Sequence, residues 1–108
     1  MSNSGSKKSV VYKRQGRTEL LKAVGHYERE RSGLGQRFKT AVDNCIERIL
    51  EFPESGDIVA GETRTRFVKK FPYRIAYQLD GELLVIFAVA RHSRDHDYWH
   101  DRIEQDDS

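Results

Sequence analysis

The dipeptide Asp80-Gly81 lies between two β-favouring segments, and this arrangement constrains the fold more than any other feature of the chain. An Asp-Gly pair with such flanks predicts a two-residue hairpin turn of type I′. The run from Leu83 to Ala90 has no alternating polar residue, which is typical of a strand covered on both faces. The sequence therefore predicts a hairpin whose second strand lies inside a sheet.

The register of this hairpin divides its side chains between two faces. If Asp80 and Gly81 form the loop, Arg74 lies opposite Phe87. One face then carries a mixed set, namely Arg74, Ala76, Gln78, Val85, Phe87, Val89 and Arg91. The other face is apolar apart from one hydroxyl and carries Ile75, Tyr77, Leu84, Ile86, Ala88 and Ala90. We expect helices on the apolar face and function on the arginine face, because a buried cation needs water or an anion.

The segments before the hairpin predict one strand and two helices. Residues 10–12 favour a β-strand. Apolar residues recur at helical spacing from Thr18 until the glycines of 32–35, and again from Phe38 to Phe52, where Pro53 ends the pattern. We therefore expect an α+β fold with an N-terminal strand, a two-helix hairpin, a short edge segment at 58–59, an antiparallel β-sheet and a short C-terminal helix.

Length and composition set the class of protein. A chain of 108 residues with a net charge of +2 predicts one domain over 10–104, a disordered leader over 1–9 and an acidic tail over 105–108. The single cysteine, Cys45, rules out an internal disulfide and is expected to be a buried structural thiol. The longest apolar run is far too short to span a bilayer, and the leader lacks the apolar core of a secretion signal. These features predict a cytoplasmic protein without a membrane partner.

Cations gather in the last part of the chain. The segment 63–77 contains no acid and predicts an anion-binding surface, the alternative being a solvated strand edge. Arg64 and Arg66 share one face of a strand, and whether Arg74 converges with them stays open. His92, His96 and His100 recur at steps of four, but a helix there conflicts with the strand ending at His92, so we expect no metal and no cofactor.

Four motifs in this order resemble the RelE/ParE superfamily of toxins from type II toxin-antitoxin modules. The resemblance covers nearly the whole folded chain and rests on short segments that are jointly specific. These are Ser32-Gly33-Leu34-Gly35-Gln36-Arg37-Phe38, Phe52-Pro53-Glu54-Ser55-Gly56, Tyr73-Arg74-Ile75-Ala76-Tyr77 and Arg91-His92-Ser93-Arg94-Asp95-His96-Asp97-Tyr98-Trp99. The resemblance implies a cognate antitoxin protein as partner and admits a toxin-antitoxin heterotetramer.

The resemblance implies two activities. RelE-like members are endoribonucleases that cleave mRNA on the ribosome, and ParE-like members inhibit DNA gyrase without being enzymes. For cleavage, the resemblance implies catalytic roles for Arg74, Arg91, His92 and Tyr98 and substrate-binding roles for Arg64, Arg66, Lys69 and Arg94. Ribosome-dependent cleavage is the first hypothesis, and gyrase inhibition or antitoxin binding alone are the alternatives. Arginine in place of the lysines of the RNase branch keeps the charge but removes a credible general base, and the two long helices favour the gyrase branch.

Overall fold

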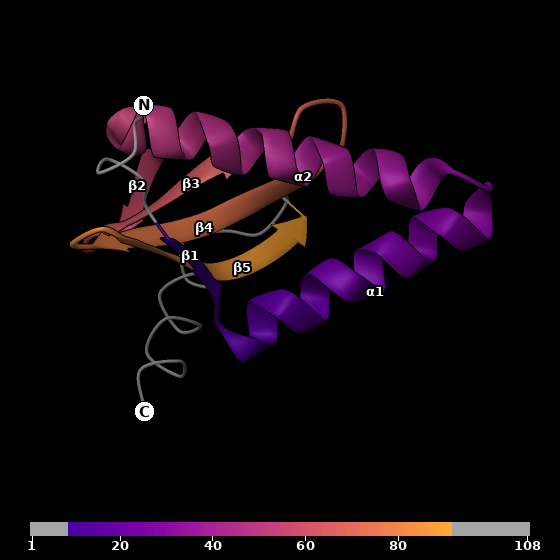
Figure 1. Cartoon of the computed structure of the whole chain (residues 1–108), viewed down its shortest axis with the longest axis horizontal. Helices are drawn as coiled ribbons and strands as arrows, with labels where there is room; N and C mark the ends of the chain where they lie inside the picture. Colours follow the sequence, from indigo (N-terminus) through magenta and orange to yellow (C-terminus); the bar gives the residue numbers. More distant parts are fainter. Residues whose placement is uncertain (1–8, 92–108) are drawn as a thin grey trace.

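A computed structural model describes residues 9–91. The elements, in chain order, are β1 (Ser9–Tyr12), α1 (Arg14–Glu30), α2 (Leu34–Glu51), the 3-10 turn η2 (Pro53–Ser55), β2 (Asp57–Ala60), β3 (Thr63–Phe67), β4 (Tyr73–Asp80) and β5 (Leu83–Arg91). The two helices form a hairpin that covers one face of the sheet (Figure 1). This architecture confirms the predicted α+β class. The predicted C-terminal helix lies outside the described residues.

The sheet has five strands in the order β1-β5-β4-β3-β2. Strand β5 lies between β1 and β4, which confirms its predicted interior position. Its long apolar run fits this place because both of its edges and its helix-side face are covered. Strand β1 pairs with β5 in parallel, with Val10 opposite Leu84, whereas β2, β3, β4 and β5 pair antiparallel. The sheet is therefore mixed rather than antiparallel throughout.

The hairpin turn differs from the prediction by one residue. Asp80 pairs with Leu83, so the two loop residues are Gly81 and Glu82 rather than Asp80 and Gly81. Gly81 has φ 63°, while neither Asp80 nor Glu82 has a positive φ. A positive φ at the first loop position alone is the pattern of a type II′ turn, which places glycine there. The predicted type I′ turn was wrong because the glycine takes the first position of the loop.

A β-bulge then changes which side chains of β5 face the helices. The register shifts between Ala76 and Tyr77, so Arg74 lies opposite Ala90 instead of Phe87. Beyond the bulge, Val89 joins the helix-side core, whereas Ala88 and Ala90 join Phe87 on the other face. The predicted faces for Val89, Arg91, Ala88 and Ala90 were therefore wrong. An extra residue in one strand reverses the inward and outward alternation after it.

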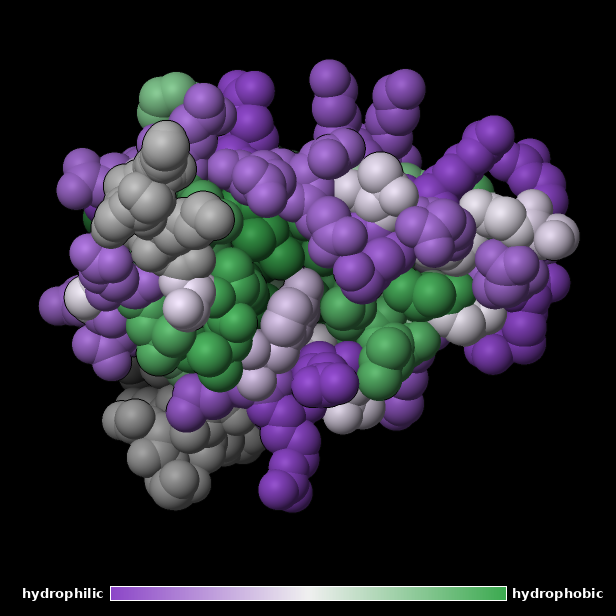
Figure 2. Space-filling view, in the orientation of Figure 1, coloured by the Kyte–Doolittle hydropathy of each residue, from purple (hydrophilic) through white to green (hydrophobic). Residues whose placement is uncertain are grey.

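The helices are held on the sheet by a large apolar core. Side chains of α1 and α2 pack against β4 and β5, and the largest fully buried ones include Phe38, Ile49, Ile75, Leu84 and Ile86. Figure 2 shows hydrophilic side chains along the outer side of α2 and apolar side chains gathered between the diverging helices. Burial of this kind stabilises by roughly 25 cal/mol per Å² of apolar area.

A carboxylate clamp fixes the turn between the helices. Both oxygens of Glu28 accept a hydrogen bond from the N–H of Gly33, at 3.1 and 3.0 Å, and one of them accepts another from Gly35, at 3.0 Å. A negative charge at the start of α2 also matches the positive end of its dipole. At Gly35 a Cβ atom would come 2.6 Å from the carbonyl oxygen of Val24. The glycine therefore allows the close approach of α1 and α2.

Candidate functional site: two groups of cations on opposite sides of the sheet

Arg64 and Arg66 lie on the helix side of the sheet. Arg64 pairs with Tyr77 and Arg66 with Ile75, and both partners belong to the helix-side core. The prediction that Arg64 and Arg66 share a face is confirmed. Arg74 lies on the opposite side, as its hydrogen bond to Thr65 shows. The three arginines therefore do not converge.

We define the η2 corner as residues 53–56 with Arg64 and Tyr77. In this corner the side chain of Arg64 holds the backbone by hydrogen bonds. Nη1 of Arg64 donates to the carbonyl oxygens of Glu54 at 3.1 Å and Gly56 at 2.9 Å. Tyr77, 1% exposed, donates its hydroxyl to the carbonyl of Pro53 at 2.8 Å and accepts from the N–H of Gly56 at 3.2 Å. Burial raises the pKa of Tyr77 despite the nearby N–H and arginines. This corner is an internal support of the fold.

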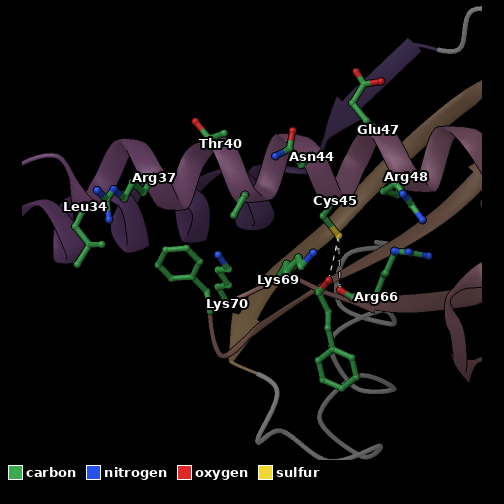
Figure 3. A pocket seen from close by; sticks show the side chains of 13 residues that line it. Leu34, Arg37, Thr40, Asn44, Cys45, Glu47, Arg48, Arg66, Lys69 and Lys70 are labelled. Carbon is green, nitrogen blue, oxygen red and sulfur yellow. Dashed lines mark hydrogen bonds between the residues drawn. The ribbon is translucent and has the colours of Figure 1, made fainter.

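A groove of about 1020 Å³ opens between α2 and the segment 66–71 (Figure 3). Its cations are Arg37 and Arg48 from α2, Arg66 from β3, and Lys69 and Lys70 from the β3–β4 loop; its one acid is Glu47. We call this the cationic groove. In Figure 3 Arg48 and Arg66 point into one end of it, and Lys69 and Lys70 point toward α2. The groove therefore concentrates positive charge from three separate elements.

The floor of the groove includes the thiol of Cys45. The cysteine is 6% exposed, and its Sγ donates to the carbonyl oxygen of Phe67 at 3.4 Å. Burial raises the pKa of Cys45 to about 11, although the charge of Arg66 lowers it in part. A thiol with so high a pKa is a poor nucleophile at neutral pH. The predicted structural role of Cys45 agrees with this environment.

Arg74 lies on the sheet face opposite the helices, the face of the buried cluster that includes Ala76 and Phe87. Its Nη1 donates to Oγ1 of Thr65 at 3.2 Å, its guanidinium lies 4.6 Å from the ring centre of Phe67, and its buried Nε has no hydrogen-bond partner within residues 9–91. The neighbouring Thr63 accepts from the amide of Gln78 at 2.7 Å. The β3 side chains that share a face with Arg74 are Thr63, Thr65 and Phe67, and none of them is charged. A single arginine backed by two threonines can hold an anion, and the described strands place no second cation beside it.

The remaining predicted site residues that the structure describes do not gather at one place. Arg91 lies on the helix side beside α1, with its guanidinium 5.6 Å from the ring centre of Tyr73. His92, Arg94 and Tyr98 lie outside the described residues. Of the predicted substrate-binding residues, Arg66 and Lys69 meet in the groove, while Arg64 belongs to the η2 corner.

The sequence reasoning missed the contribution of α2 to the groove. Arg37 and Arg48 lie on this helix together with Ala41 and Cys45, which also line the groove. Their positions recur at steps of four, four and three, so they share one side of an α-helix. That spacing was a readable signal. The spacing identifies a common side of α2, but it does not show that the β3–β4 loop lies opposite that side. Only the folded structure shows this.

Comparison with known proteins identifies the family. The profile of the ParE toxin of the type II toxin-antitoxin system, parDE, matches residues 10–96. The chain belongs to the ParE toxin family. A solved structure described as the chromosomal ParDE TA system from P. aeruginosa has a TM-score of 0.68 and 13% sequence identity, and the match covers 80% of this chain and 97% of that one. No curated protein matches the sequence significantly. At this identity the structural match supports the shared fold.

Residues 9–91 show neither a metal-binding cluster nor a membrane-spanning helix. This part of the chain contains no group of three or more His, Cys, Asp or Glu side chains that would hold a metal ion. None of its helices combines the length and the apolar content that a membrane crossing needs.

Proposed function

We propose that this ParE-family chain is a bacterial cytoplasmic toxin that inhibits DNA gyrase by surface contact and is neutralised by a cognate antitoxin. The observation that carries the choice of a binding mechanism is the separation of the cations. Among residues 9–91, Arg74 lies on the sheet face opposite the helices, Arg64 is engaged with backbone carbonyls, and Arg66 lines the groove on the helix side. RNA cleavage requires groups that act together on one phosphate.

The neighbours of Arg74 also favour binding over cleavage. Cleavage of RNA needs a base for the 2′-hydroxyl, charge stabilisation and an acid for the leaving oxygen. On β3 the side chains on the face of Arg74 are Phe67 and two threonines, Thr63 and Thr65, whose hydroxyls accept hydrogen bonds from Gln78 and Arg74. Neither threonine is a credible general base near neutral pH, and arginine does not give up its proton. Arg74 is better suited to hold an acidic group of a protein target.

Exposed apolar side chains support a protein partner. Val10 and Val11 on β1 and Leu21 on α1 are 37%, 44% and 60% exposed. Apolar side chains together with cations form a surface that an amphipathic acidic segment can cover. This combination fits an antitoxin that folds on binding. A heterotetramer of toxin and antitoxin is one assembly of this kind, and the mass of the purified complex measures it.

The test is to induce the chain in cells and measure two products. Plasmid supercoiling reports on gyrase, and sequencing of mRNA 5′ ends reports on cleavage. We expect relaxed plasmids and unchanged mRNA ends in the first minutes after induction. New mRNA ends that depend on translation, with normal supercoiling, would overturn gyrase inhibition in favour of the RNase hypothesis.

Matched variants separate the two mechanisms further. We expect His92→Gln and Tyr98→Phe to keep toxicity, because a binding mechanism needs no proton transfer at these positions. We expect Arg74→Ala to weaken gyrase inhibition by about tenfold, the effect of losing one charged contact with a protein. Arg17→Glu, an exposed change on α1, serves as the control for charge alone. Loss of toxicity in His92→Gln and Tyr98→Phe with a folded chain would support cleavage.

A further inference from the structure

The sheet face opposite the helices is buried, yet no helix of residues 9–91 covers it. On this face Thr63, Ala76 and Ala88 are 0% exposed and Thr65 is 2% exposed. Figure 1 shows α1 and α2 on the other side of the sheet, and the η2 turn contacts residues of the helix side. Side chains on a bare sheet face point into water. A cover from outside the described residues is therefore needed.

The larger side chains of this face do not supply the cover. Phe87 is the largest member of the apolar cluster there, and a ring that sheltered the neighbouring alanines would itself be exposed. Phe87 is 8% exposed, and Val59, on the edge strand β2, is 9% exposed. Nζ of Lys13 lies 5.8 Å from the ring centre of Phe87, so it accompanies one side of the ring without enclosing it. The cover therefore extends over the strands from β5 to β2.

The cover must also supply a hydrogen-bond acceptor beside Arg74. The buried Nε of this arginine has no partner within residues 9–91, while its Nη1 donates to Thr65. The ring of Phe67 occupies one side of the guanidinium, with its centre 4.6 Å away. A buried donor without an acceptor is destabilising, and a carboxylate is the strongest partner for a guanidinium. The face is therefore matched to a segment that carries both apolar side chains and carboxylates.

The segment 92–108 has this composition and starts at the right place. It contains Tyr98, Trp99 and Ile103 among acids at 95, 97, 101, 104, 106 and 107. It follows directly on β5, where Ala90 lies opposite Arg74. An extended chain spans up to about 13 Å over four residues and about 26 Å over eight. The four residues of β5 back to Phe87 cover about 13 Å, so both Arg74 and the Phe87 cluster lie within reach of this segment.

We propose that the segment 92–108 docks on the sheet face opposite the helices, with Trp99 over the Phe87 cluster and Asp95 or Asp97 paired with Arg74, and that the target competes with this carboxylate for Arg74. The competition, unlike the docking, rests on the proposed function, which assigns Arg74 to the target. A segment of the same chain has the advantage over a separate partner that its effective concentration is high. The target meets a free Arg74 only in the fraction of molecules in which the segment has opened.

Fluorescence of the full chain tests the docking, because Trp99 is the single tryptophan. We expect the folded wild type to emit at a shorter wavelength than the urea-unfolded chain, at every protein concentration. Phe87→Ala, held at a temperature where circular dichroism shows a folded chain, should shift the emission to longer wavelength. A folded wild type that emits like the unfolded chain would overturn the inference. A shift to shorter wavelength that appears only at high protein concentration would also overturn it, because a second copy would then cover the face.

Hydrogen exchange tests the carboxylate pair. We expect Arg74→Gln, and separately Asp95→Asn with Asp97→Asn, to speed exchange of the amides in 92–104 by about tenfold, the effect of losing one charged hydrogen bond. The amides of α2 in the same samples report on global stability and should keep their rates. Arg17→Gln, an exposed change on α1, should alter exchange of the segment by less than about twofold. Equal exchange of the segment in all four proteins, wild type included, would overturn the pairing.

Inhibition of gyrase supercoiling tests the competition. Asp95→Asn with Asp97→Asn should inhibit at a concentration about tenfold lower than the wild type needs, since the apparent affinity scales with the fraction of molecules whose Arg74 is free. Equal or weaker inhibition by this variant, with its segment opened as exchange reports, would overturn the competition. Absence of inhibition by every protein, with the fluorescence and exchange results as expected, would reject the proposed target and leave the docked segment standing.

Discussion

The η2 corner and the cationic groove share strand β3 but use its arginines differently. Arg64 donates to two backbone carbonyls, of Glu54 and Gly56, and so closes the turn beneath α2. Arg66, two residues later on the same face, lines the groove, and its one side-chain hydrogen bond to a described residue goes to the hydroxyl of Ser55. The difference shows that the charge of a side chain does not decide its role. The decisive property is whether backbone acceptors lie within its reach.

If the η2 corner supports the fold and the cationic groove does not, the largest loss of stability is expected for Tyr77→Phe in the corner. The change leaves the carbonyl of Pro53 and the N–H of Gly56 without their partner in a buried place. Two unsatisfied backbone groups cost about 3 kcal/mol in the free energy of unfolding. Urea denaturation measures it, with Tyr73→Phe as the control, because the hydroxyl of Tyr73 has no hydrogen bond to a described residue. Equal stability of the two variants would mean that the corner is not a support.

A smaller loss is expected for Arg64→Ala in the same corner. Its guanidinium forms two hydrogen bonds to carbonyl oxygens in a half-buried position. Hydrogen bonds from a charged donor contribute about 2 kcal/mol in total here after screening by solvent. Thermal unfolding measures the effect. An Arg64→Ala variant as stable as the wild type would place Arg64 with the groove and break the comparison.

The sequence predicted most of the fold because local patterns carry it. The apolar run of β5, the two helical repeats and Pro53 each identified their elements without knowledge of the tertiary structure. The bulge at the register shift between Ala76 and Tyr77 could not be predicted, because no residue type marks an extra residue in an apolar strand. That single feature moved Val89 and Arg91 to the helix side. An alternation argument holds only as far as the first irregularity of the strand.

The site was less predictable than the fold for a related reason. Arg66 and Lys69 were named from one cationic segment, but the groove also needs Arg37 and Arg48, which lie far earlier in the chain. A surface made from several elements depends on long-range packing, which charge patterns along the sequence do not report. Arg64 shows the converse case, since nothing in its local sequence indicates that the carbonyls of the η2 corner lie within its reach.

Alkaline pH should lower the free energy of unfolding, because the buried thiol of Cys45 ionises there. Burial raises the pKa of Cys45 from 9.0 to about 11, so the stability that the neutral thiol contributes is fully present below pH 9 and is lost as the pH rises toward 11. The loss for this group is about 1 kcal/mol by pH 10. Burial also raises the pKa of Tyr12, to about 12, so Cys45→Ala is the comparison that isolates the thiol. Identical pH profiles of wild type and Cys45→Ala would contradict this assignment.

The smallest change in stability is expected for Arg66→Ala, and it tests the comparison most directly. The side chain has no carboxylate partner among the described residues, and its bond to Ser55 is exposed. Removing an exposed polar contact changes the free energy of unfolding by less than about 0.5 kcal/mol. Removing one of several like charges also relieves repulsion within the groove, which offsets part of that loss. Urea denaturation of Arg66→Ala beside Arg64→Ala measures the contrast on a single strand face. If the two alanine variants lose equal stability, both arginines support the fold, and the groove has one cation fewer for binding.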